Sequence, residues 1–217
     1  MFIGHFGVGF AAKKPTTAPS LGTLFLASQF IDLLWPIFLL LGIEKVQIDP
    51  GNTVVTPLNF ISYPYSHSLF GVLIWAILFA VIYYLIKKDL KISIWLGLLV
   101  LSHWIFDLFT HRPDLLLFPW SDIKVGLGLW NSLIGTIVIE GLIFLVGVYI
   151  YFKFTKAKNK IGIWSLWSLV IFLTIIYLSN LFGPPPPSAE PIAYIGFAQW
   201  LIIIWGYWID RNREIKT

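Results

Sequence analysis

The sequence predicts an all-α membrane protein: a polytopic bundle of six transmembrane helices and a short half-helix at the N-terminus. Hydrophobic residues make up 58% of the chain and charged residues only 12%, which is about half the charged share of a soluble domain. The apolar residues gather in six runs, each near the ~20 residues that cross ~30 Å of hydrocarbon. The runs lack the alternation of a transmembrane β-barrel. A single helical membrane domain therefore fits residues 1–217.

The six runs define the expected spans in chain order: residues 20–43, 67–86, 92–111, 127–152, 161–182 and 192–209. Before them, residues 1–12 are apolar but too short to cross. Their lysines follow the apolar stretch instead of preceding it, unlike a signal peptide, so we expect a half-helix that dips into the bundle. Within the first span, Pro36 cannot donate a hydrogen bond to the carbonyl of Asp32, which predicts a kink there.

Basic residues mark one side of the predicted bundle. Of the 15 Lys and Arg residues, only Lys45, Arg112 and Lys124 fall on the other side, together with acidic residues such as Glu44, which leaves 12 on the first side. The positive-inside rule places the side rich in basic residues in the cytoplasm. We therefore expect a protein of the cytoplasmic (inner) membrane. Both termini should be cytoplasmic, or the N-terminus should be buried in the bundle.

The absence of cysteine and the placement of charge limit the possible partners. Without cysteine, disulfides and thiolate metal sites are excluded. A net charge of +4 would suggest nucleic acid binding in a soluble protein. Here the charges follow the sides of the membrane instead, so the expected partner is the lipid bilayer and not a nucleic acid.

Histidine and acidic side chains in the apolar runs are the candidate functional groups. Ionisable groups in hydrocarbon are costly, so they usually face a cavity or one another and mark function. His103 and Asp107 lie four residues apart in one predicted helix, and His111 follows after four more, so the three share a face. Imidazole and carboxylate without thiol form a ligand set for zinc and similar divalent metals.

Three further groups can reach the same half of the bundle. His67 begins the second span on the side of His111, Asp32 lies near the middle of the first span, and His5 lies in the N-terminal half-helix. Each of these groups could instead be a separate polar side chain that is hydrogen-bonded to a neighbour. His111 could be a further metal ligand or have no role in metal binding. The expected metal ligands are His5, Asp32, His67, His103 and Asp107.

Glu140 and Arg112 are the candidates for catalytic roles. Glu140 is the one charged residue in the run 127–152. It could be a general base, orient a ligand histidine, or be a protonated side chain bonded to a neighbouring helix. Arg112 lies at the expected mouth of the cavity, where it could bind a phosphate through two nitrogens or pair with Asp114.

These motifs give the chain a resemblance to a known family. The chain resembles bacterial and archaeal inner-membrane proteins that are grouped as metal-dependent hydrolases and were first named for a LexA-regulated membrane protein. The resemblance lies in four motifs and their order: Gly4-His5, Asp32, the run from Ser66 to Leu69, and His103 with Asp107. The resemblance covers residues 1 to about 140 and implies a metal-dependent hydrolase. The family often has Pro-Asp-x-Asp around the position of Asp32, and this chain lacks the second acid, which argues against a two-metal site.

The leading hypothesis is a membrane-embedded metal-dependent hydrolase. A divalent metal, with zinc as the first candidate, would lower the pKa of a bound water toward ~7 and polarise the scissile bond. A site in the outer half of the membrane suggests a lipid or lipid-linked phosphoester as the substrate. One alternative is a transporter for a metal ion or protons that uses the same His and Asp residues. The other is a non-catalytic scaffold in which the polar groups hold helices together.

We expect single cysteines at Ser188 and Asn159 to report opposite sides of the membrane. The excess of basic residues places Asn159 in the cytoplasm and Ser188 outside. An impermeant maleimide applied to intact cells should label Ser188→Cys and leave Asn159→Cys unlabelled until the cells are opened. The wild-type chain has no cysteine and is therefore the blank. Labelling of Asn159→Cys alone would reverse the orientation.

Overall fold

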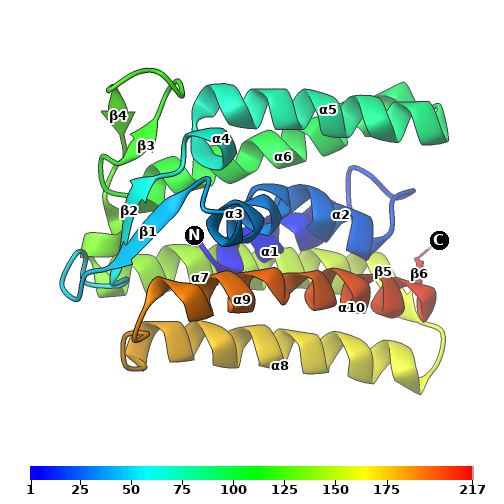
Figure 1. Ribbon diagram of the computed structural model, residues 1–217. Coiled ribbons are helices and arrows are strands. Elements are labelled where there is room, and N and C mark those ends of the chain that lie inside the picture. Colours follow the sequence, from blue (N-terminus) through cyan, green and yellow to red (C-terminus); the bar gives the residue numbers. More distant parts are fainter. Residues whose placement is uncertain (217) are drawn as a thin grey trace.

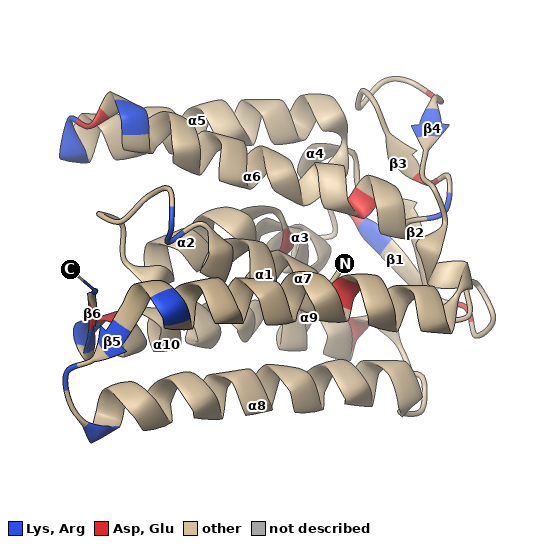
Figure 2. Ribbon diagram, turned by 180° about the vertical axis from the view of Figure 1, so that it is seen from behind, with Lys and Arg blue, Asp and Glu red and all other residues tan. Residues whose placement is uncertain are grey.

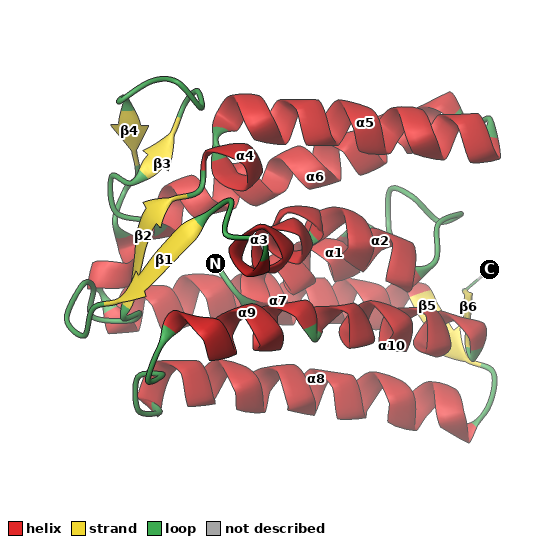
Figure 3. Ribbon diagram, viewed as in Figure 1, coloured by secondary structure: helices red, strands yellow, loops and turns green. Residues whose placement is uncertain are grey.

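The computed structural model describes residues 1–216 and consists mainly of helices (Figures 1 and 3). In this part of the chain, five helical segments are long and apolar enough to cross a membrane. They are α5 (Leu69–Lys87), α6 (Leu90–Thr110), α7 (Leu133–Phe154), α8 (Lys160–Phe182) and α9 (Ala189–Phe197) continued by α10 (Gln199–Arg211). A sixth is formed if α2 (Leu21–Ser28) and α3 (Phe30–Leu40) are counted together across their 58° bend. The predicted all-α membrane bundle is confirmed.

The helices form three layers in Figure 1. Helices α5 and α6 lie side by side along one edge, and α7, α8 and α9–α10 lie along the other. Between them are α1 (Ile3–Ala11), α2 and α3, with the N-terminus near the centre of the view. Phe6 and Phe10 of α1 are fully buried in the same core as Leu166 of α8 and Ile203 of α10. The segment predicted as a half-helix is therefore a central element of the bundle.

The second span begins later than predicted because a serine caps it. The side chain of Ser68 accepts a hydrogen bond from the backbone N–H of Gly71, and α5 begins at Leu69. His67, which we expected to open this span, instead ends the short helix α4 (Pro64–His67). The backbone between the two helices is extended at Ser68, so the direction of the chain changes right after His67.

Other helix ends also differ from the predicted bounds, among them the start of α7 and the end of α6. Helix α7 begins at Leu133 instead of residue 127, because Ser132 caps it and the residues before it form a 3₁₀ turn, η1 (Leu129–Asn131). Helix α6 ends at Thr110, and His111 is its C-cap with extended backbone. His111 was predicted inside this helix, which was wrong by one residue.

The first span bends before Asp32, at the break between α2 and α3. The break falls at Gln29, whose φ of −103° and ψ of 3° are not helical. Pro36 lies inside α3, where its ring packs against Gly196 of α9. Helix α3 therefore continues through Pro36, where a packed neighbouring helix allows proline within a membrane helix, and the kink at this residue stays a prediction. The bend at Gln29 brings the carbonyl of Ser28 next to α6.

Short antiparallel strand pairs close the two ends of the bundle (Figure 3). At one end, β1 (Lys45–Ile48) pairs with β2 (Leu58–Ser62), and β3 (Leu115–Leu116) pairs with β4 (Lys124–Val125). At the other end, β5 (Thr155–Ala157) pairs with β6 (Arg213–Ile215). Most Lys and Arg residues lie at the β5–β6 end, where Figure 2 shows them in blue. The basic loops that alternate along the sequence therefore gather at one end of the fold.

Helix α1 crosses α7 so closely that neither backbone leaves room for a side chain. A Cβ atom on Gly147 would overlap the carbonyl oxygen of Gly7, and one on Gly7 would lie 2.6 Å from the carbonyl oxygen of Ile143. Glycine allows such contacts in membranes, where no hydrophobic force brings helices together and close packing must do so. The crossing fixes the position of His5, which lies two residues before Gly7.

We predict that Gly147→Ala disrupts the contact between α1 and α7, whereas Gly141→Ala on the same helix does not. Among residues 1–216, nothing lies within 4 Å of a Cβ atom added at Gly141. Alanine is also a better helix former than glycine there by ~0.5–1 kcal/mol. Overpacking at Gly147 should lower the free energy of unfolding by ~1–3 kcal/mol. Thermal unfolding of the two purified variants measures the difference, and equal melting temperatures would contradict the close crossing.

Candidate metal centre

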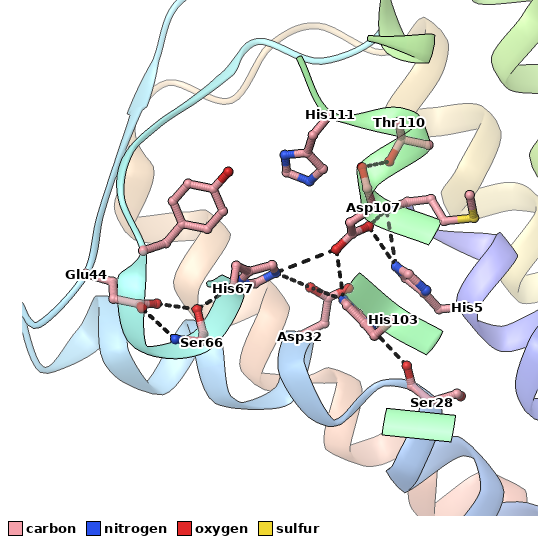
Figure 4. Close-up of polar contacts among 12 residues, drawn as sticks. His5, Ser28, Asp32, Glu44, Ser66, His67, His103, Asp107, Thr110 and His111 are labelled. Atoms are coloured by element: carbon pink, nitrogen blue, oxygen red, sulfur yellow. Dashed lines mark hydrogen bonds and ion pairs between the residues drawn. The ribbon is translucent and has the colours of Figure 1, made fainter. Parts of the chain in front are cut away.

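Helix α6 supplies the two central residues of a buried polar cluster (Figure 4). Nε2 of His103 lies 3.2 Å from Oδ2 of Asp107, one helical turn further along. His103 is 0% exposed and Asp107 is 1% exposed. The spacing of four residues thus places both groups on the inner face of α6, as the sequence predicts.

Asp32 from α3 and His67 from α4 face the same two groups (Figure 4). Nε2 of His67 lies 3.5 Å from Oδ1 of Asp32 and 3.9 Å from Oδ2 of Asp107. Nε2 of His103 lies 3.4 Å from Oδ1 of Asp32. Three chain segments therefore direct two imidazoles and two carboxylates toward one point. The side chain of Asp32, at 22% exposure, is the most accessible of the four.

A backbone carbonyl determines which nitrogen of His103 faces the carboxylates. Nδ1 of His103 lies 2.9 Å from the carbonyl oxygen of Ser28. A carbonyl oxygen only accepts, so Nδ1 carries the proton. In the neutral ring, Nε2 then has a lone pair that faces Asp32 and Asp107. This buried Nε2 lies within ion-pair distance of both carboxylates, so in a neutral ring its lone pair can bind a metal ion together with them.

The separations of the donor atoms fit a divalent cation. Two atoms that are each ~2.0–2.2 Å from a zinc ion are ~3.3–3.6 Å apart in a tetrahedral site. The four separations between His and Asp atoms in the cluster are 3.2, 3.4, 3.5 and 3.9 Å. Two groups of three have ligand atoms within 4.8 Å of one another: Asp32 with His67 and His103, and His5 with His103 and Asp107. Because His103 has one free nitrogen and belongs to both groups, the geometry fits one ion.

His5 lies on the other side of Asp107. Its Nε2 is 3.0 Å from Oδ1 of Asp107, and its ring stacks on that of His103 with centroids 3.6 Å apart. The amino nitrogen of Met1 lies 3.2 Å from the same Nε2 and also contacts Oδ1 of Asp107. The structure therefore brings all five expected ligands together. The side that faces Asp32 and His67 is the better place for an ion, because the nitrogen of Met1 lies on the other side.

His111 lies near the cluster but has other partners. Its Nδ1 is 3.0 Å from Oδ1 of Asp114, and its ring centroid is 6.5 Å from that of His67. Asp114 also accepts a hydrogen bond of 2.8 Å from the hydroxyl of Tyr63. Burial raises the pKa of Asp114, but the hydrogen bonds from His111 and Tyr63 outweigh burial and hold that pKa below its usual value. His111 thus belongs to the loop that covers the cluster and not to either group of ligand atoms.

Arg112 is directed toward the β1–β2 hairpin. Its Nη2 donates to the side-chain oxygen of Asn59 at 2.6 Å, and its Nε lies 3.4 Å from Oδ2 of Asp114. The pairing with Asp114, one of the two possibilities raised by the sequence, is therefore present. A role in binding a phosphate stays a prediction.

Glu140 connects α7 to the beginning of α1. Its Oε2 accepts a hydrogen bond of 2.9 Å from the backbone N–H of Phe2, and the residue is buried. The first N–H groups of a helix have no partner within the helix, and a carboxylate there also interacts favourably with the helix dipole. Glu140 therefore stabilises the start of the helix that carries His5. Among its three possible roles, this contact agrees best with a side chain bonded to a neighbouring helix, because its partner is the backbone of Phe2 and not a histidine ring.

Two groups to which the sequence analysis assigned no role contact the histidines of the cluster. One is the carbonyl of Ser28, described above. The other is Ser66, whose Oγ lies 2.7 Å from Nδ1 of His67 and which also donates to the buried carboxylate of Glu44. Every residue has a backbone carbonyl, so the residue type at position 28 does not predict this contact. In the sequence, Glu44 at the end of an apolar run cannot be distinguished from an exposed acidic residue in a loop. Only the fold shows that it is buried.

A comparison with protein families identifies the group to which the chain is related. A family model described as "YdjM inner membrane protein" matches residues 3–182. The chain belongs to the YdjM inner membrane protein family. No curated protein and no solved structure matches the chain. The resemblance noted in the sequence is thus confirmed at the level of an inner-membrane protein family, and the matched range contains all five clustered residues together with Glu140 and Arg112.

Replacing Glu140 tests its role at the start of α1. Glu140→Ala should lower the free energy of unfolding by ~1–3 kcal/mol, because the buried N–H of Phe2 loses its acceptor. Glu140→Gln keeps a carbonyl oxygen for this N–H and should remain close to wild type. Denaturant unfolding in detergent measures both variants, and equal losses would contradict the capping role. If Glu140 were a general base, Glu140→Gln would remain stable but lose ~10²–10⁴-fold of any hydrolytic rate.

Proposed function

We propose that this member of the YdjM family is a membrane-embedded, metal-dependent hydrolase. The observation that supports it most is the buried Nε2 of His103, which lies 3.2 and 3.4 Å from oxygens of two carboxylates that come from different helices. Ionisable groups in hydrocarbon are costly to keep and usually mark a functional site. Histidine and carboxylate ligands are a set that zinc uses in catalytic sites.

Each residue of the cluster would have a distinct role toward the ion. His67 and His103 would each contribute Nε2, and Asp32 and Asp107 would contribute carboxylate oxygens that offset the positive charge. His5 would contact the other oxygen of Asp107 and so hold this carboxylate from the opposite side. A bound divalent ion would supply Lewis-acid chemistry, which activates water and polarises a scissile bond. Glu140 would act indirectly, by stabilising the helix of His5.

The position of the cluster suggests the class of substrate. His67 follows β2 closely in the chain, and Asp107 lies one turn before the end of α6 that leads to β3. The cluster therefore lies toward the β1–β4 end of the bundle, away from the end that has most basic residues (Figures 1 and 2). With the basic end in the cytoplasm, the site would face the outer leaflet. We infer a lipid or lipid-linked phosphoester, with Arg112 as the candidate to bind its anionic group.

Metal content tests the proposal. Wild-type protein purified without chelators should contain about one divalent ion per chain, and His103→Ala should lose it because a missing ligand opens the coordination sphere. His111→Gln is the matched control, since His111 is outside both groups of ligand atoms, and this variant should keep the metal. Elemental analysis measures all three proteins. Wild-type protein without metal, or His103→Ala with wild-type stoichiometry, would overturn the assignment.

Turnover without a gradient separates the hydrolase from a transporter that uses the same residues. Metal-loaded protein in detergent should hydrolyse phospholipid or polyprenyl phosphoesters, and His103→Ala should not. Uptake of Zn²⁺ into vesicles, without hydrolysis in detergent, would favour the transporter instead.

A further inference from the structure

Three hydrogen-bonded side chains lead from the β1 end of the bundle to the cluster (Figure 4). The carboxylate Oε2 of Glu44 accepts a hydrogen bond of 2.6 Å from Oγ of Ser66. The same Oγ lies 2.7 Å from Nδ1 of His67, whose Nε2 faces Asp32 and Asp107. Glu44, Ser66 and His67 are 2%, 0% and 3% exposed, so water does not compete for these contacts.

Glu44 determines the direction of these hydrogen bonds. Its Oε1 accepts the backbone N–H groups of Tyr65 and Ser66, at 2.9 and 2.8 Å. An ionised carboxylate only accepts, so the hydroxyl of Ser66 must give its one proton to Oε2. Only lone pairs of Oγ then remain for His67, and Nδ1 of His67 must be the donor. The neutral ring is left with a lone pair on Nε2.

We propose that Glu44 and Ser66 are positioning residues that hold His67 with its proton on Nδ1, so that Nε2 can bind the metal. This inference deepens the proposed function and rests on it for the metal, but the position of the proton does not depend on an ion. Ligand histidines usually donate their second N–H to an oxygen, and loss of that partner weakens metal binding by ~10–100-fold. His103 reaches the same state through Ser28, so both rings direct Nε2 inward by different means.

Glu44→Gln tests the charge of Glu44 while keeping its shape. The N–H groups of Tyr65 and Ser66 require an oxygen on their side, so the amide NH₂ must face Oγ of Ser66. The hydroxyl of Ser66 then accepts from the amide and donates its proton to Nδ1 of His67. The proton of His67 moves to Nε2, where it blocks the ligand position.

Nitrogen NMR of histidine-labelled, metal-free protein measures this change directly. The chain has four histidines, so the signals of His67 can be assigned with a His67→Gln variant. Nδ1 of His67 should be protonated in wild type and in Ser66→Thr, which keeps the hydroxyl, and unprotonated in Glu44→Gln. A purely structural role of Glu44 would leave the proton in place. An unprotonated Nδ1 in wild type, or no change in Glu44→Gln, would overturn the proposal.

Zn²⁺ affinity, measured by competition with a chromophoric chelator, is the second readout. Glu44→Gln and Ser66→Ala should bind Zn²⁺ ~10–100-fold more weakly than wild type, and Ser66→Thr should bind nearly as well. Glu190→Gln is the matched control, because Glu190 is an exposed residue in the first turn of α9. Wild type that binds no Zn²⁺ would refute the proposed function while the NMR result still decides the role of Glu44. Equal affinities of wild type and Glu44→Gln would refute the positioning role alone.

Discussion

A carboxylate buried in hydrocarbon persists only where donors and cationic groups surround it, and Asp107 imposes this requirement on the fold. One of its oxygens faces His5 and the nitrogen of Met1, and the other faces His67 and His103. These partners come from α1, α4 and α6. The three elements must therefore meet around a single side chain, and the arrangement of this half of the bundle follows from that need.

Apart from α6, the helices that meet there are short or interrupted. Helix α1 has nine residues, α4 has four, and the break at Gln29 separates α2 from α3. Irregular backbone is costly in a membrane unless it is buried in protein or lines a polar site. Here the interruptions are useful, because the break at Gln29 presents the carbonyl of Ser28 to His103 and the turn after α4 directs His67 inward. The glycine crossing with α7 allows α1 to lie deep enough for His5 to reach Asp107.

A second acid, which is partly buried, shows what a structural ion pair looks like in the same molecule. At the basic end, Asp210 accepts from Nζ of Lys13 at 2.7 Å and from the hydroxyl of Tyr151 at 2.6 Å, so each of its oxygens has a donor. The cluster around Asp107, by contrast, brings Nε2 atoms of two imidazoles within 3.9 Å of two carboxylates. The convergence of several ligand-type groups is what distinguishes this candidate site from a helix-to-helix contact.

Composition and spacing determined the class of the protein, the apolar runs that form its long helices and the pair His103 and Asp107, because the length of an apolar run and the turn of a helix are local properties. The same reasoning selected His5, Asp32 and His67 as candidate ligands from their residue types and positions, but it did not predict which atoms they contact. Only the tertiary structure decided that the first span bends at Gln29, that His111 turns to Asp114, and that Glu140 holds the start of α1. It also decided that Glu44 is buried against Ser66. These outcomes depend on which helix ends meet in the folded protein. The local sequence around an acidic residue does not show whether distant segments will bury it.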